Sequence, residues 1–159
     1  MMQDIGDLYP NGKVDKKIIK NFANTLGVEF PPEYIELISQ HDGLTPKISS
    51  FDFIDTDGEL NISCVEFGGY MHTPRIEGFQ FPEGDDDYDG KLIGFGGTPN
   101  GDSICFDYRF PWAKDQPKIV LVLHDNFYDY GSNQDKRKIL FLADRFEHFI
   151  NSLHEYIEY

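Results

Sequence analysis

The sequence predicts an α+β fold: two helices first, then a mostly antiparallel sheet, and one helix at the end. Apolar residues recur at helical spacing between residues 16 and 41, and again after the run KILFL near the C-terminus. Between these segments lie several short runs rich in β-branched and aromatic residues, separated by turn residues. No linker or internal repeat divides the chain, so we expect one domain over residues 1–159.

Two helices are expected in the first part of the chain. Asp15 suits the N-cap of the first helix, and Gly27 is placed to end it. Its expected apolar face is formed by Ile18, Ile19, Phe22 and Leu26. The second helix is expected within FPPEYIELISQHDG, because Pro32 suits a first turn and Gly43 stops the pattern. Its predicted stripe comprises Tyr34, Leu37, Ile38 and His41.

Sequence patterns in the middle of the chain predict β-strands. KISSFDFI and ELNISCVEF flank Asp55-Thr56-Asp57-Gly58, and an Asp-Gly pair between such runs indicates a β-hairpin. Residues 68–90 are rich in glycine, proline and acidic residues, which indicates a long loop between the strands. The sheet is expected to resume with LIGF, SICFDY, IVLVLHD and KILFL.

The last helix is expected to begin after Asp144. Glu147, three residues further on, completes the pattern of a capping box. The predicted buried stripe of this helix comprises Phe146, Phe149, Ile150, Leu153 and Ile157.

The stretch GGTPNGDS, residues 96–103, has the glycine spacing of a phosphate-binding loop. Asp102 stands where that loop needs lysine, and a carboxylate repels phosphate. The residues that follow alternate like a strand, whereas a phosphate-binding loop opens a helix. Thr98-Pro99-Asn100-Gly101 is favourable turn chemistry, so we interpret the stretch as a hairpin turn.

The net charge of the chain limits the classes of molecule that it can bind. The formal net charge is −14, which disfavours binding to nucleic acids and to anionic membranes and attracts basic proteins. The alternative is that the acidity only keeps the protein soluble. The sequence has no apolar run long enough to span a bilayer and no signal-peptide pattern, so we expect a cytoplasmic protein.

No catalytic or cofactor motif is found, and we expect neither enzymatic activity nor a cofactor. Asp85, Asp87 and Asp89 match the first half of a calcium loop, but Gly96 occupies the position of the bidentate glutamate, so an acidic loop is the alternative to a weak cation site. The five histidines lack metal-ligand spacing, and no metal site is predicted. Cys105 lies between apolar residues near acidic ones, which favours a packed thiol.

Three stretches, FPPEYIELISQHDG, IGFGGTPNGDSICFDYR and ILFLADRFEHFINSL, together resemble the SUKH superfamily, or SMI/KNR-like domains, in the order typical of that family. The resemblance implies two initial helices, an antiparallel sheet and a closing helix. Many bacterial members are immunity proteins against polymorphic toxins, often nucleases, and a fungal branch acts as a regulatory scaffold. The positions that match the family pattern are Pro32, Tyr34, Gly43, Gly101, Asp102, Asp107, Phe146 and Phe149.

The resemblance and the acidity together predict an immunity protein that neutralises a cognate basic toxin, with a non-catalytic regulatory scaffold as the alternative. The predicted partner-binding residues are Asp85, Asp86, Asp87, Tyr88, Asp89, Asp102 and Trp112. Two roles are open for Trp112: an interface anchor, or a residue that packs beside Pro111 and pins its loop.

Overall fold

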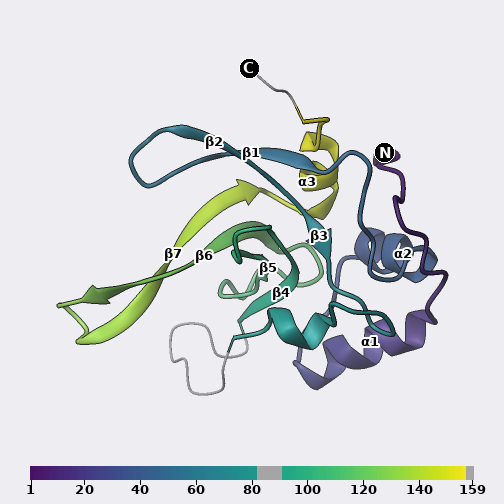
Figure 1. Ribbon diagram of the computed structural model, residues 1–159. Helices are drawn as coiled ribbons and strands as arrows, with labels where there is room; N and C mark the ends of the chain where they lie inside the picture. The colour runs from purple at the N-terminus through teal and green to yellow at the C-terminus, as the bar shows by residue number, and fades with distance from the viewer. Residues whose placement is uncertain (82–90, 157–159) are drawn as a thin grey trace.

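The computed structural model describes residues 1–81 and 91–156, and it confirms the α+β fold class. Two helices come first, α1 (Lys16–Thr25) and α2 (Pro32–Gln40), and α3 (Phe146–Ser152) comes last. A 3-10 helix, η1 (Ile76–Phe79), precedes the second half of the sheet. Figure 1 shows α1 and α2 on one side of the sheet layer, with α3 beneath the first hairpin.

The described strands form two antiparallel sheets. β1 (Ser50–Ile54) and β2 (Leu60–Cys64) pair with each other as a two-stranded sheet. A five-stranded sheet has the order β3-β4-β5-β6-β7, so its strands follow one another in space as they do along the chain. Its strands are β3 (Glu66–Phe67), β4 (Leu92–Gly97), β5 (Ser103–Asp107), β6 (Lys118–Asp129) and β7 (Gln134–Ala143).

The signals at the first helix are largely confirmed. Asp15 is the N-cap of α1, where its side chain accepts a hydrogen bond from the backbone N–H of Lys17. Gly27 adopts a positive φ of 73° just beyond the helix, a conformation that favours glycine. The expected apolar face is confirmed at Ile19, which is buried, and wrong at Ile18, which is exposed, because the buried face of the helix runs through Ile19 and Ala23.

The last helix differs more from its prediction. Arg145 rather than Asp144 is the N-cap of α3, and among the described residues no side chain caps the helix. Glu147 does not complete a capping box, because its carboxylate pairs with the N-terminal ammonium of Met1 at 2.7 Å. The helix ends before Leu153, since His154 forms an antiparallel bridge with Ser50 at the start of β1. Ile157 lies outside the described residues.

The core is built from aromatic rings contributed by distant segments. Phe95 on β4 and Phe106 on β5 stack with their centroids 4.3 Å apart. Tyr34 on α2 meets Phe106 edge-on at 5.1 Å and Phe146 on α3 at 5.5 Å. Burial of these large rings, together with their edge-to-face geometry, holds α2 and α3 against one face of the sheet.

The two longest strands, β6 and β7, form an arm that reaches beyond the rest of the sheet (Figure 1). Their pairing continues as far as Asp129 opposite Gln134. The sequence predicted shorter strands here, because the residues after Leu123 are mainly polar and the apolar runs end. Backbone pairing with a neighbouring strand needs no apolar face, so the hairpin continues into solvent.

Candidate functional site

The turn at residues 98–101 is confirmed as the hairpin connection between β4 and β5. The backbone N–H of Thr98 donates to the carbonyl of Asp102, and that of Gly101 donates to the carbonyl of Thr98. Gly101 adopts a φ of 92°. A strand, not a helix, follows the turn, so the loop has no helix N-terminus to hold a phosphate.

Asp102, a predicted partner-binding residue, is only 4% exposed. Its Oδ1 accepts hydrogen bonds from the backbone N–H of His124, at 3.0 Å, and from Nδ1 of the same residue, at 2.7 Å. The His124 ring itself is about half exposed. A protein that docks at this turn would therefore meet the imidazole, while the carboxylate lies behind it.

The electrostatics of the pair favour a charged histidine. The hydrogen bond to Asp102 is the largest cause that raises the pKa of His124, and the nearby charges of Asp125 and Asp102 act in the same direction. Asp125 lies 3.2 Å from the other ring nitrogen of His124. This end of the sheet thus holds the half-exposed His124 ring between the buried carboxylate of Asp102 and the exposed carboxylate of Asp125.

Two other buried acids hold loops in place. Asp42, which follows α2, accepts hydrogen bonds from the backbone N–H groups of Tyr70 and Met71, at 2.7 and 2.9 Å, and contacts the His72 ring at 2.9 Å. Asp107, at the end of β5, accepts two hydrogen bonds from the guanidinium of Arg109. Their carboxylates are occupied, so both residues have a clear role in positioning the chain.

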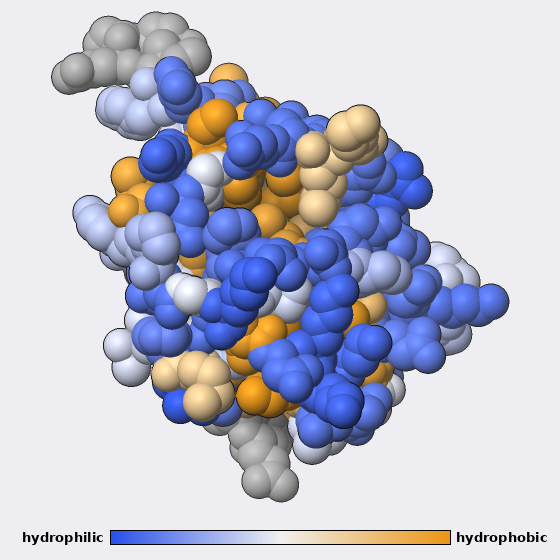
Figure 2. Space-filling model, turned by 90° about the vertical axis from the view of Figure 1, so that its right-hand side faces the viewer, coloured by the Kyte–Doolittle hydropathy of each residue, from blue (hydrophilic) through white to orange (hydrophobic). Residues whose placement is uncertain are grey.

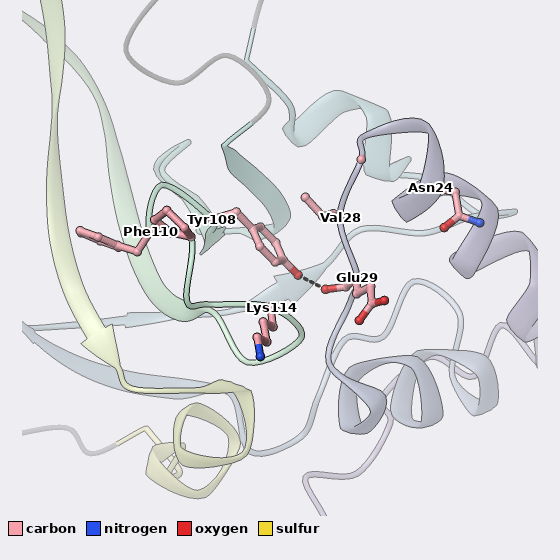
Figure 3. Close-up of a pocket in the computed structure, with 8 residues that line it drawn as sticks. Asn24, Val28, Glu29, Tyr108, Phe110 and Lys114 are labelled. Carbon is pink, nitrogen blue, oxygen red and sulfur yellow. Dashed lines mark hydrogen bonds between the residues drawn. The ribbon is translucent and has the colours of Figure 1, made fainter.

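A cavity of about 590 Å³ opens between the end of α1 and the loop that follows β5. Its wall is made by residues from both segments: Asn24, Gly27, Val28, Glu29, Tyr108, Phe110, Pro111 and Lys114. Figure 3 shows the Tyr108 ring reaching across to the backbone of Glu29, while the Phe110 ring turns the other way. The phenol donates a hydrogen bond of 2.5 Å to the Glu29 carbonyl, which ties the two walls together.

Charges of both signs surround this cavity. Burial is the main cause that raises the pKa of Tyr108, and the carboxylates of Asp115 and Glu29 are close enough to raise it further. The phenol therefore stays neutral and acts as a hydrogen-bond donor. Lys114 contributes a cation and has a positive φ of 50°, an uncommon backbone conformation for lysine.

Trp112 lies beside this cavity on the same loop. It is the only tryptophan of the chain and is 73% exposed. Its ring packs against Phe110 with a centroid separation of 5.1 Å and a tilt of 33°. Phe110 in turn lies under the Arg109 guanidinium, 5.8 Å from the ring centroid. The loop thus presents an aromatic pair whose outer ring is largely in solvent.

The predicted partner-binding residues do not form one described cluster. Asp85, Asp86, Asp87, Tyr88 and Asp89 lie outside the described residues, as does the half calcium loop. Asp102 precedes β5 and Trp112 follows it, so these two residues mark opposite ends of one strand. No local sequence pattern predicts this cavity, because Glu29 and Tyr108, which line it, are separated by 79 positions in the chain.

The two thiols have the environment of structural cysteines. Cys105 is fully buried and Cys64 half-buried, and both are free. Burial first, and then Asp107 for Cys105 and Glu66 for Cys64, raises the pKa of each thiol. Both effects disfavour the thiolate that a nucleophile needs. Within residues 1–81 and 91–156, no group of three or more histidine, cysteine or acidic side chains could hold a metal ion.

Comparison with known proteins gives one family. The family model for the SMI1 / KNR4 family (SUKH-1) matches residues 13–152, which include all three helices and both sheets. No curated protein and no solved structure matches the chain. The matched range contains the α2 segment, the β4–β5 turn and the α3 segment on which the sequence resemblance was based. The chain therefore belongs to the SMI1/KNR4 family, SUKH-1.

Proposed function

We propose that this chain is an immunity-type binding protein that neutralises a cognate basic toxin in the cytoplasm, with a nuclease as one candidate toxin. It acts by occupying the toxin surface and performs no chemistry of its own. Membership of the SMI1/KNR4 family and the net charge of −14 support this proposal. A nuclease carries a basic groove for phosphates, and an acidic protein can compete for that groove.

The observation that carries the proposal is the exposed aromatic pair of Trp112 and Phe110 beside the cavity lined by Glu29. Tryptophan is prominent among interface residues that supply most of the binding energy. Trp112 keeps most of its surface in solvent, so packing beside Pro111 leaves most of the indole available to a partner. This supports the interface role over a purely loop-pinning one.

The charge and the aromatic pair have different tasks in the proposed mechanism. The negative field of the whole chain attracts a basic toxin and accelerates encounter, an effect that salt weakens. The aromatic pair then slows dissociation by burying apolar surface in the complex. Figure 2 shows mainly hydrophilic side chains, broken by smaller hydrophobic areas, on the side of α1 and α2.

The proposal is tested by expressing the protein together with the product of a neighbouring toxin-like gene and measuring cell survival. Survival that requires the intact protein supports immunity, whereas death of cells that contain both proteins contradicts it. Recovery of several unrelated partners from a pull-down would favour the regulatory scaffold instead.

The role of Trp112 is tested by measuring the affinity of Trp112→Ala for the same toxin, and Tyr130→Ala serves as the matched control because Tyr130 is another exposed aromatic residue. Trp112→Ala should weaken toxin binding by about 2 kcal/mol, the usual minimum for a dominant interface residue. Thermal melting should show both variants folded. Equal affinities of the two variants would remove Trp112 from the interface.

A further inference from the structure

The hairpin β1–β2 has an inner and an outer face. Side chains alternate across a strand, and Phe51 and Phe53 share the inner face, where Phe51 packs against Phe149 on α3 at 5.7 Å. On the outer face, Ile54 lies opposite Leu60, one pair along from Phe53 and Asn61. The register thus places two aliphatic side chains side by side, away from the core.

These two side chains are strongly exposed. Ile54 is 56% and Leu60 is 65% accessible. The hairpin pairs with no other described strand apart from the single bridge between Ser50 and His154. A solvent-exposed aliphatic pair on a two-stranded sheet gains little from its own fold, so its apolar surface is available for burial by a partner.

The hairpin that carries this aliphatic pair is rich in acidic residues. Residues 50–64 contain Asp52, Asp55, Asp57 and Glu59 and no basic residue. The turn is fixed by its own acids, since Asp55 accepts from the backbone N–H of Thr56 and Asp57 accepts from that of Glu59. Asp52 lies on the outer face opposite Ile62, where its carboxylate accepts a hydrogen bond from Nε2 of His154 at 2.9 Å, whereas Asp55 accepts from Asn61 on the inner face. The carboxylates of Asp52 and Asp57 are thus ordered beside the aliphatic pair before any partner arrives.

A second cavity, of about 460 Å³, extends the outer face at the base of the hairpin. Ile62 and Cys64 of β2 line it, together with Pro99 and Asn100 of the β4–β5 turn and the exposed ring of Tyr156. Ile62 follows Leu60 on the same face of β2. The aliphatic pair is thus continuous with a depression that can receive a side chain.

We propose that the outer face of the β1–β2 hairpin, formed by Ile54, Leu60 and Ile62 with Asp52 on the same face and Asp57 at the adjoining turn, is a docking surface for a basic protein partner. The partner would present an apolar side chain to the aliphatic residues and lysine or arginine side chains to the acids. The partner class rests on the proposed function, but the surface is separate from the Trp112 loop. A second copy of this chain, with its own net charge of −14, would bring the same acidic hairpin against its equivalent, which like-charge repulsion disfavours.

The test uses the full chain labelled with ¹⁵N and a defined probe, the peptide acetyl-Lys-Leu-Lys-Leu-Lys-amide. Titration should shift the amide signals of residues 52–62 and Tyr156 progressively, and the shifts should weaken as salt is raised. The acidic peptide acetyl-Glu-Leu-Glu-Leu-Glu-amide should leave these signals unchanged. Equal responses to both peptides, or shifts confined to other parts of the chain, would overturn the proposal.

Leu60→Asn should weaken binding of the basic peptide about tenfold, the loss expected for an apolar residue near the centre of an interface. Leu8→Asn is the matched control, because Leu8 is also exposed but lies in the N-terminal segment. Both variants must retain the amide spectrum of the folded chain. Signals of residues 52–62 that shift with protein concentration alone would indicate self-association through this face and would also overturn the proposal.

The peptide experiment and the survival assay fail independently. Loss of peptide binding with survival intact would remove the hairpin and leave the immunity proposal standing. Hairpin binding without protection of cells would remove the immunity proposal and leave the docking surface without a toxin as its partner.

Discussion

Asp102 and His124, 22 positions apart in the chain, are joined by two hydrogen bonds to a single carboxylate oxygen, one from the backbone and one from the ring. The contact fastens the β4–β5 turn to β6 where the pairing of β6 with β7 is interrupted, between Val122 and Asn126. The buried carboxylate of Asp102 is therefore paired with a histidine ring whose charge depends on pH.

This pair predicts a pH-dependent contribution to stability. Because the folded pKa of His124 is raised, its contribution is fully present below the ordinary value of 6.5 and is lost as the pH rises through the folded pKa. Asp102→Asn should lower the pKa of His124 and flatten this dependence. A ring NMR titration and melting curves from pH 5 to 9 measure both effects.

His154 contributes in the same direction and is the relevant control for that experiment. The carbonyl of Glu155 and then the carboxylate of Asp52 raise its pKa. Its titration should not change in Asp102→Asn, because neither group contacts Asp102. An unaltered His124 titration in the variant would contradict the assigned cause.

Tyr34→Phe should destabilise the fold by about 1–3 kcal/mol. The hydroxyl groups of Tyr34 and Tyr70 are 2.8 Å apart and buried, so the substitution leaves the Tyr70 hydroxyl without its partner. Urea unfolding measures the loss. In the double variant Tyr34→Phe and Tyr70→Phe both hydroxyls are absent, so it should lose less stability than the sum of the single changes.

Asp42→Ala should cost about 3 kcal/mol, because one substitution removes the acceptor of two backbone N–H groups and of the His72 ring. Asp42→Asn retains one oxygen acceptor and should lose less stability. Asp57→Ala, at the exposed β1–β2 turn, is the control and should have a small effect. Chemical unfolding of the three variants would refute the assigned role if Asp42→Ala and Asp57→Ala were equally stable.

The cysteines should react slowly with a thiol reagent at neutral pH. Cys105 is fully buried and should be modified only when the chain unfolds, whereas Cys64, which is half-buried, should react slowly in the folded state. Absorbance after addition of an aromatic disulfide follows the reaction, and urea provides the control for both thiols. Rapid modification of a thiol in the folded protein would indicate an activated cysteine and would weaken the proposal that the chain is not an enzyme.

The sequence by itself determined those helix ends and turns that depend only on residues close together in the chain. The Asp15 cap, Pro32 in the first turn of α2 and the Asp57-Gly58 turn depend on neighbouring backbone groups, so they could be predicted correctly. The predicted cap at Asp144 was wrong: Arg145 is the N-cap, and the Glu147 carboxylate pairs with the N-terminal ammonium group of Met1, a contact that no local pattern contains. The acidic balance was likewise evident from composition alone.

Only the tertiary structure decided which distant residues meet. The Tyr108–Glu29 contact, the Asp102–His124 pair and the exposed face of the first hairpin depend on the order of the strands and on how the helices pack against them. In the folded chain, burial of the aromatic core keeps segments that are far apart in the sequence next to each other, and these contacts depend on that proximity. The free energy of burying the core is spread over many aromatic rings. For this reason no short sequence motif predicts which surface residues will become neighbours.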